Sequence, residues 1–95
     1  MFIFNKEELL RSIGCEDVKS YMLVNNYGYT FVSSGFKFDL RHWLNCYGAD
    51  VDYWLLDGYN QVTKQYASLD GSKYKSFKTF EDAFEFLKLY MKGGE

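Results

Sequence analysis

The chain has 95 residues, of which 47% are hydrophobic and 25% are charged, with nine Tyr, nine Phe and two Trp. This composition predicts one ordered domain over residues 1–95 and excludes intrinsic disorder. The net charge is −2 and only two of the eleven basic residues are Arg, so the broad positive surface of a duplex-binding protein is not expected. The apolar start is short and polar residues follow from Asn5, so neither a signal peptide nor a membrane span is predicted. The protein is therefore expected to be cytoplasmic.

The first predicted element is a short helix that begins after Asn5. Asn5 is a good N-cap residue, and Glu8 stands at the third helical position, as in a capping box. Gly14 is suited to the left-handed residue that ends a helix. A β-hairpin is predicted next, because residues 18–24 and 29–33 are rich in β-forming residues and those between them tolerate positive φ.

A second helix is predicted over residues 40–47. Its apolar residues follow the i, i+3, i+4, i+7 spacing of one helix face: Leu40, Trp43, Leu44 and Tyr47. Asp39 precedes this pattern as an N-cap, and Gly48 follows its last turn. The interpretation as a helix places Trp43 in the core of the protein.

Two more strands and a final helix complete the predicted order. The strands cover residues 51–57 and 61–69, with turns at 58–60 and 70–71. The final helix begins after Thr79, ends near residue 92 and buries an apolar stripe that includes Phe84. The fold class predicted is α+β: a two-layer sandwich in the order αββαββα, whose four-stranded antiparallel sheet has helices packed on one face.

Alternation along the predicted strands divides their side chains between two faces of the sheet. The face assigned to the helices carries Met22, Val24, Val32, Trp54, Leu56, Ala67 and Leu69. The opposite face carries Tyr21, Leu23, Tyr29, Phe31, Tyr53, Leu55 and Tyr66, with Lys19 and Lys64 among them. A face lined with Tyr is suited to binding, because these rings supply contact area at a low entropic cost. Two alternatives stay open: another part of the chain or a dimer mate covers this face, or a register shift of one residue exchanges the two faces.

The final helix has a wider apolar surface than packing on a sheet requires. Phe86 lies at the edge of its apolar stripe, and Leu89 lies on the other side of the helix. With Tyr90 they form a ridge that can seed a dimer or contact a target. The alternative is that the apolar residues 2–4 fold over this ridge.

Three further groups of residues are candidates for catalysis or ligand binding. His42 and Cys46 are four residues apart on the predicted second helix, but no third group is present to orient a catalytic imidazole. A basic and aromatic stretch before the last helix contains Lys73, Lys75 and Lys78 and could hold a phosphate. A solvated loop is the preferred interpretation of this stretch. Carboxylates in predicted turns favour local hydrogen bonds over a cation site: Asp50, Asp52, Asp57 and Asp70.

These patterns favour a small acidic protein-binding module that acts by stoichiometric binding, such as an immunity or anti-defence inhibitor from a phage or other mobile element. The predicted partner-binding residues are Tyr21, Tyr29, Phe31, Tyr53, Tyr66, Asp57, Phe86 and Leu89. The chain is expected to be a monomer or a homodimer without catalytic residues, metal or cofactor. The alternative is a single-stranded nucleic-acid binder that stacks bases on the Tyr-rich face. The net negative charge places this alternative second.

Overall fold

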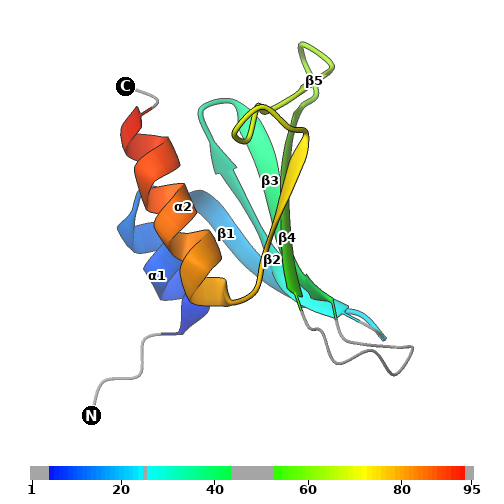
Figure 1. The fold of residues 1–95 in the computed structure, drawn as a ribbon, viewed down its shortest axis with the longest axis vertical. Coiled ribbons are helices and arrows are strands. Elements are labelled where there is room, and N and C mark those ends of the chain that lie inside the picture. The colour runs from blue at the N-terminus through cyan, green and yellow to red at the C-terminus, as the bar shows by residue number, and fades with distance from the viewer. Residues whose placement is uncertain (1–4, 25, 44–52, 94–95) are drawn as a thin grey trace.

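A computed structural model describes residues 5–24, 26–43 and 53–93 of the chain (Figure 1). The elements, in chain order, are α1 (Lys6–Ser12), β1 (Glu16–Met22), β2 (Asn26–Ser33), β3 (Phe36–Trp43), β4 (Tyr53–Asn60), β5 (Gln65–Tyr66), β6 (Tyr74–Phe77) and α2 (Phe80–Gly93). The protein is therefore an α+β fold with an antiparallel sheet, as predicted. Within the described residues, the sheet has six strands instead of the four expected.

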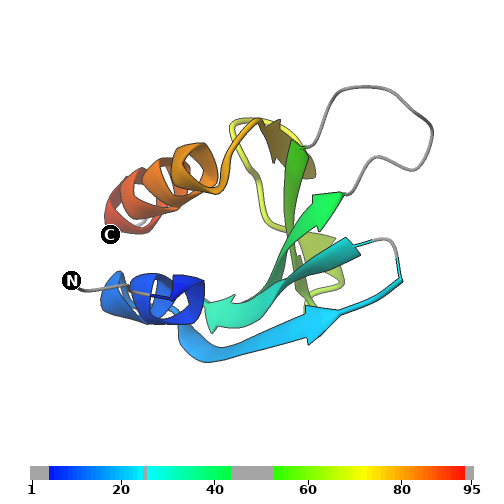
Figure 2. The same cartoon turned by 90° about the horizontal axis from the view of Figure 1, so that it is seen from below.

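The sheet runs in the order β1, β2, β3, β4, and β4 then pairs with two short strands. β5 pairs with the end of β4 at Tyr59 and Asn60, whereas β6 pairs with residues 54–57. Figure 2 shows both helices on the same side of this sheet. Among the described residues, no helix covers the other side.

Local capping sets the start of each helix, as predicted. The side-chain oxygen of Asn5 accepts a hydrogen bond of 2.8 Å from the backbone N–H of Glu8. The hydroxyl of Thr79 accepts one of 3.1 Å from the backbone N–H of Asp82. These bonds satisfy backbone donors that the first turn of a helix leaves unpaired.

The predicted second helix is corrected to a strand over residues 40–43, and its remaining residues lie outside the described part of the chain. Ser34 and Gly35 have φ values of 54° and 84°, the backbone that joins two strands through a two-residue loop. The hairpin pairs Ser33 with Phe36 and continues through β3. Because β3 is hydrogen-bonded on both sides, the pairing outweighs the helical spacing of its apolar residues.

The register of the first hairpin corrects the predicted position of two candidate binding residues. Tyr21 and Tyr29 were expected to share a face, but Tyr21 pairs with Gly28, and Tyr29 pairs with Ser20. Since neighbouring residues point to opposite faces, this places Tyr29 and Phe31 on the helix side. Phe31 is 0% exposed, and the ring of Tyr29 lies 6.3 Å from that of Phe80 on α2. Both rings therefore belong to the core side of the sheet.

The later strands also differ from the prediction in their boundaries. The turn expected at residues 58–60 occurs at residues 61–64. The side-chain oxygen of Asn60 accepts hydrogen bonds from the backbone N–H groups of Val62 and Thr63 at 2.9 and 3.1 Å. The stretch before α2, interpreted as a loop, forms β6. This strand extends the open surface beyond β4.

The core lies between the sheet and the helices. Its buried side chains are Leu10, Cys15, Val18, Phe31, Phe38, Leu40, Trp54, Leu56, Ala67, Leu69, Phe80, Ala83 and Leu87. The expected burial of Trp54, Leu56, Ala67 and Leu69 is confirmed. Phe84 is half-buried against Phe80, and the expected burial of the Trp43 side chain lies outside what the structure describes.

Candidate functional site

The face of the sheet opposite the helices, called the open face below, is formed by alternate residues of neighbouring strands. The register aligns one row across four strands: Tyr21, Gly28, Arg41 and Leu55. The adjacent row is Lys19, Thr30, Asp39 and Asp57. Paired residues in a sheet point to the same face, so these side chains share one surface.

Four of these residues form a charge cluster at the centre of the open face. Arg41 Nη1 lies 2.9 Å from Asp39 Oδ2, and Arg41 Nη2 lies 3.6 Å from Asp57 Oδ2. The hydroxyl of Tyr21 donates a hydrogen bond of 2.8 Å to the other oxygen of Asp39. Between these groups, two carboxylates share one guanidinium. The charge cluster is defined as Tyr21, Asp39, Arg41 and Asp57, and among these four side chains the carboxylates outnumber the guanidinium by one.

The environment shifts the pKa of two members of the charge cluster. Burial raises the pKa of Asp57, and the nearby Asp39 raises it further, while Arg41 acts in the opposite direction. Burial likewise raises the pKa of the Tyr21 hydroxyl, with the hydrogen bond to Asp39 contributing in the same direction. Tyr21 is thus held as a neutral donor. The pKa of Asp57 is raised chiefly because its carboxylate is partly buried, and shifted pKa values are common at functional sites.

Asp57→Asn is expected to leave stability at neutral pH unchanged or to raise it by less than about 1 kcal/mol. The pKa of Asp57 in the folded protein lies above its usual 3.8, so the folded state binds this proton more readily than the unfolded chain does. Relative to the variant, the parent should therefore gain stability as the pH falls from neutral through the Asp57 pKa. Urea unfolding at several pH values measures this. A variant clearly less stable at neutral pH would show that the Arg41 contact outweighs burial.

Exposed Tyr side chains surround the charge cluster. Tyr53 is 38% exposed at the start of β4, Tyr66 is 49% exposed and Tyr74 is 62% exposed. The ring of Tyr59 packs against that of Tyr66 with centroids 4.9 Å apart. The predicted placement of Tyr21, Tyr53 and Tyr66 together on one face therefore agrees with the strand register. Sequence analysis missed the contribution of Tyr74 because its segment was interpreted as a loop.

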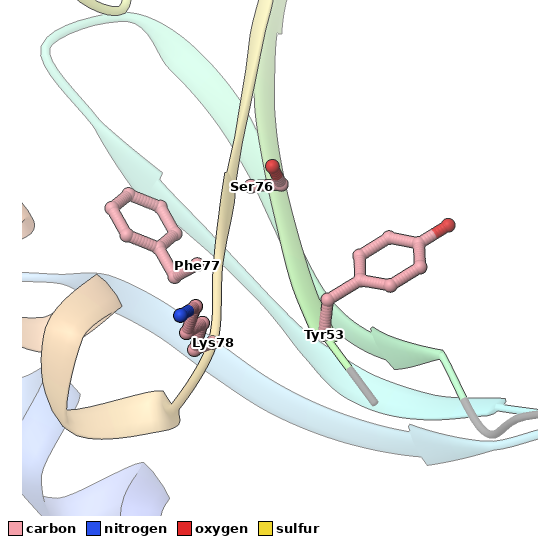
Figure 3. A pocket seen from close by; sticks show the side chains of 4 residues that line it. All are labelled: Tyr53, Ser76, Phe77 and Lys78. Atoms are coloured by element: carbon pink, nitrogen blue, oxygen red, sulfur yellow. The ribbon is translucent and has the colours of Figure 1, made fainter. Parts of the chain in front are cut away.

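A concavity of about 430 Å³ lies where β4 and β6 meet, lined by Tyr53, Ser76, Phe77 and Lys78. Figure 3 shows the rings of Tyr53 and Phe77 on opposite sides of the paired strands. Rings that diverge in this way cannot hold a small ligand between them. The concavity is therefore part of the surface relief beside the open face rather than a convergent small-molecule site.

The turn between β1 and β2 exposes three consecutive aliphatic residues. Met22 is 82% exposed, Leu23 is 61% exposed and Val24 is 93% exposed. The register places Met22 opposite Tyr27, on the predicted face, but the expected coverage of Met22 and Val24 by the helices is wrong, because both side chains are exposed. The turn lies at the end of the sheet away from the β4–β5 turn (Figure 1). We call these three residues the β1–β2 tip.

The predicted ridge on the final helix is only partly exposed. The ring of Phe86 stacks on Tyr90 with centroids 5.9 Å apart and lies 5.5 Å from that of Phe77. Leu89 is 69% exposed. Phe86 therefore packs mainly within the protein, and Leu89 alone projects strongly. Residues 2–4, considered as a cover for this ridge, lie outside the described part of the chain.

Apart from Asp57, the described residues that were considered for catalysis or ligand binding lie outside the charge cluster. His42 lies in β3 on the core side, with its ring 5.0 Å from that of Trp54, and Cys46 lies outside the described residues. Burial raises the pKa of the Cys15 thiol to about 12, which makes it unreactive. Lys75 lies 3.4 Å from Asp70, which partly neutralises the basic stretch. Asp50 and Asp52 lie outside the described residues, within which no group of three or more potential ligands could hold a metal ion.

Comparison with known proteins finds no match to a family model, a curated protein or a solved structure. In the described part of the chain, neither helix is long and apolar enough to cross a membrane. The open face, its charge cluster and the β1–β2 tip are therefore the features from which a function can be inferred.

Proposed function

We propose that this protein is a non-catalytic binding module that docks a protein partner through its open face. One observation carries the proposal: a sheet surface without a covering element from the described residues combines exposed Tyr side chains with a central Arg and two carboxylates. Tyr and Arg are enriched at the centres of protein interfaces, where they supply large contact area and directional hydrogen bonds. A partner that covers this surface would remove both the Tyr and the Arg side chains from water.

The charge cluster indicates the chemistry of the partner. Asp39 accepts hydrogen bonds from Tyr21 and Arg41, whereas Asp57 has a longer contact of 3.6 Å with Arg41. A Lys or Arg side chain from the partner would complete the compensation of Asp57 and lower its pKa. A basic patch on the partner therefore suits the centre of the open face.

The exposed aliphatic residues of the β1–β2 tip favour a protein partner that has an apolar surface beside its basic patch. Residues 20–36 contain no charged residue, so the tip and its flanking strands do not favour an anionic surface or a polyanion. A specific interface buries about 1,200–2,000 Å² in total, more than three aliphatic side chains can supply. The tip therefore acts with the open face rather than alone.

We propose that the module inhibits its target by occupying the target's binding cleft. A small module that covers a basic cleft on its target competes directly with the ligand of that cleft. The origin of such an inhibitor in a phage or other mobile element remains a prediction from composition. A nucleic-acid platform made of Tyr21, Tyr29, Phe31 and Tyr53 is less well supported, because Tyr29 and Phe31 belong to the core side.

Affinity capture from host lysate at moderate salt should recover a stoichiometric protein partner, and variants locate its binding surface. Leu23→Ser combined with Val24→Ser removes the apolar tip, and Tyr53→Ala removes an exposed ring. We expect each to weaken the purified complex by about ten-fold or more, as interface hot spots do. Titration calorimetry with the recovered partner measures the change.

Val62→Ser is the matched control for the tip variant. Val62 is 91% exposed in the β4–β5 turn, at the other end of the sheet. This variant should bind like the parent. Failure to recover any stoichiometric partner, or equal binding by the parent and by the tip and Tyr53 variants, would contradict the proposed function.

A further inference from the structure

One end of the open face differs in charge from the rest of the protein. Residues 61–78 contain four Lys and one Asp, whereas the whole chain has a net charge of −2. The carboxylate in this segment, Asp70, lies 3.4 Å from Lys75 Nζ. Lys75 pairs with the buried Leu56 on the helix side, and Lys78 lies beside Tyr53 at the start of β4. Lys64 and Lys73 are therefore the positive charges that the segment places at this end, where they are available to an anionic ligand.

Three Tyr residues lie at this end of the open face. Tyr59 on β4 pairs with Tyr66 on β5, and their rings meet at an angle of 63°. Tyr74 on β6 pairs with Asp57, which is two residues from Tyr59, so Tyr66 and Tyr74 are displaced by about 7 Å along the strands. Tyr66 is 49% exposed and Tyr74 is 62% exposed, which leaves aromatic surface for stacking.

Lys side chains frame these rings. Lys73 Nζ lies 5.5 Å from the centroid of the Tyr66 ring. Lys37 on β3 pairs with Tyr59 and is exposed, and Lys64 is exposed in the turn between β4 and β5. We call this surface the basic end, defined as Tyr59, Tyr66, Tyr74, Lys37, Lys64 and Lys73. Its residues come from four strands and two turns, so the fold assembles it from distant parts of the chain.

We propose that the basic end binds single-stranded nucleic acid, with about three bases on the Tyr rings and the phosphates near the Lys side chains. A single strand exposes the base faces that a duplex hides, and stacking on aromatic rings tolerates any base sequence. An acidic peptide would satisfy the Lys side chains but would leave the rings without a stacking partner. The site includes no side chain of the charge cluster or of the β1–β2 tip, but it shares Tyr66 and Tyr74 with the open face, and Tyr74 pairs with Asp57.

Fluorescence anisotropy with labelled oligothymidylate and oligouridylate of about ten nucleotides tests this site. The parent should bind both at low salt, and its affinity should fall with a log–log salt slope of about −2, as expected for three phosphate contacts. Tyr66→Ala should weaken binding by about five-fold or more through the loss of a stacked base. Lys73→Gln should lower the affinity and make the salt slope shallower by about 0.7.

Two variants serve as controls for these effects. Tyr66→Phe retains the ring and should retain most of the affinity. Lys88→Gln removes a lysine that also lies over an aromatic ring, 5.8 Å from the centroid of Phe84, but on the helix side of the protein. It should bind like the parent. No anisotropy change at low salt, an equal loss with Lys88→Gln, or equally effective competition by polyglutamate would overturn the proposal, whatever the outcome for a protein partner.

Discussion

Phe38→Ala is expected to lower the free energy of unfolding by about 3–5 kcal/mol, the range for removing a buried aromatic ring. Phe38 is 0% exposed, and its ring stacks on Phe31 with centroids 5.4 Å apart at an angle of 15°. The ring of Tyr90 on α2 meets it edge-on at 6.0 Å. The side chain thus joins two strands to the final helix, and its loss would leave a cavity where these elements meet.

Urea unfolding of Phe38→Ala, compared with Lys37→Ala, measures this contribution. Lys37 is the neighbouring residue on β3 and is exposed, so its truncation tests whether any change in this strand has the same effect. The Lys37 variant should differ little from the parent, because exposed substitutions usually have small effects. Equal stability of the two variants would show that Phe38 is not part of the core.

The helix boundaries are predictable from sequence because capping is a local interaction. Asn5 and Thr79 bond to backbone groups only three residues away, so the residue types reveal the geometry. The strand β3 is not predictable in this way, because residues 36–47 fit two periods. The helical spacing begins at Leu40, whereas alternation runs from Phe36 through His42. Pairing with β2 and β4, which are distant contacts, decides between them.

The open face is predictable only where the strand register is clear. Tyr53 and Tyr66 share the expected face, since alternation within β4 and the pairing of β5 are simple. The position of Tyr29 depends on how many residues form the preceding turn, and an error of one residue reverses the face. The charge cluster requires β1, β3 and β4 to be aligned. Alternation of Asp39 and Arg41 with apolar residues was the signal that could have revealed its centre.

The second large effect is expected at Gly28, on the open face between Tyr21 and Arg41. A Cβ atom at this position would lie 2.5 Å from the backbone oxygen of Leu40 and 2.7 Å from Arg41 Cα. These are backbone atoms of the paired strand, so the contact is relieved only by separating β2 from β3. Gly28→Ala is therefore expected to destabilise the protein by about 3 kcal/mol, at the upper end of the range for overpacking.

Thermal unfolding of Gly28→Ala should show a decrease in Tm of about 12 °C or more for a domain of this size. Thr30→Ala, a substitution on the same face of β2, is the matched control and should have a much smaller effect, since it removes atoms instead of adding them. Because Tyr21 lies on β1, which is paired with β2, strand separation would also move the Tyr21 hydroxyl away from Asp39 on β3. Gly28→Ala should therefore weaken partner binding even at temperatures where it remains folded. A variant with the Tm and partner affinity of the parent would mean that β2 and β3 are not as closely paired as the register indicates.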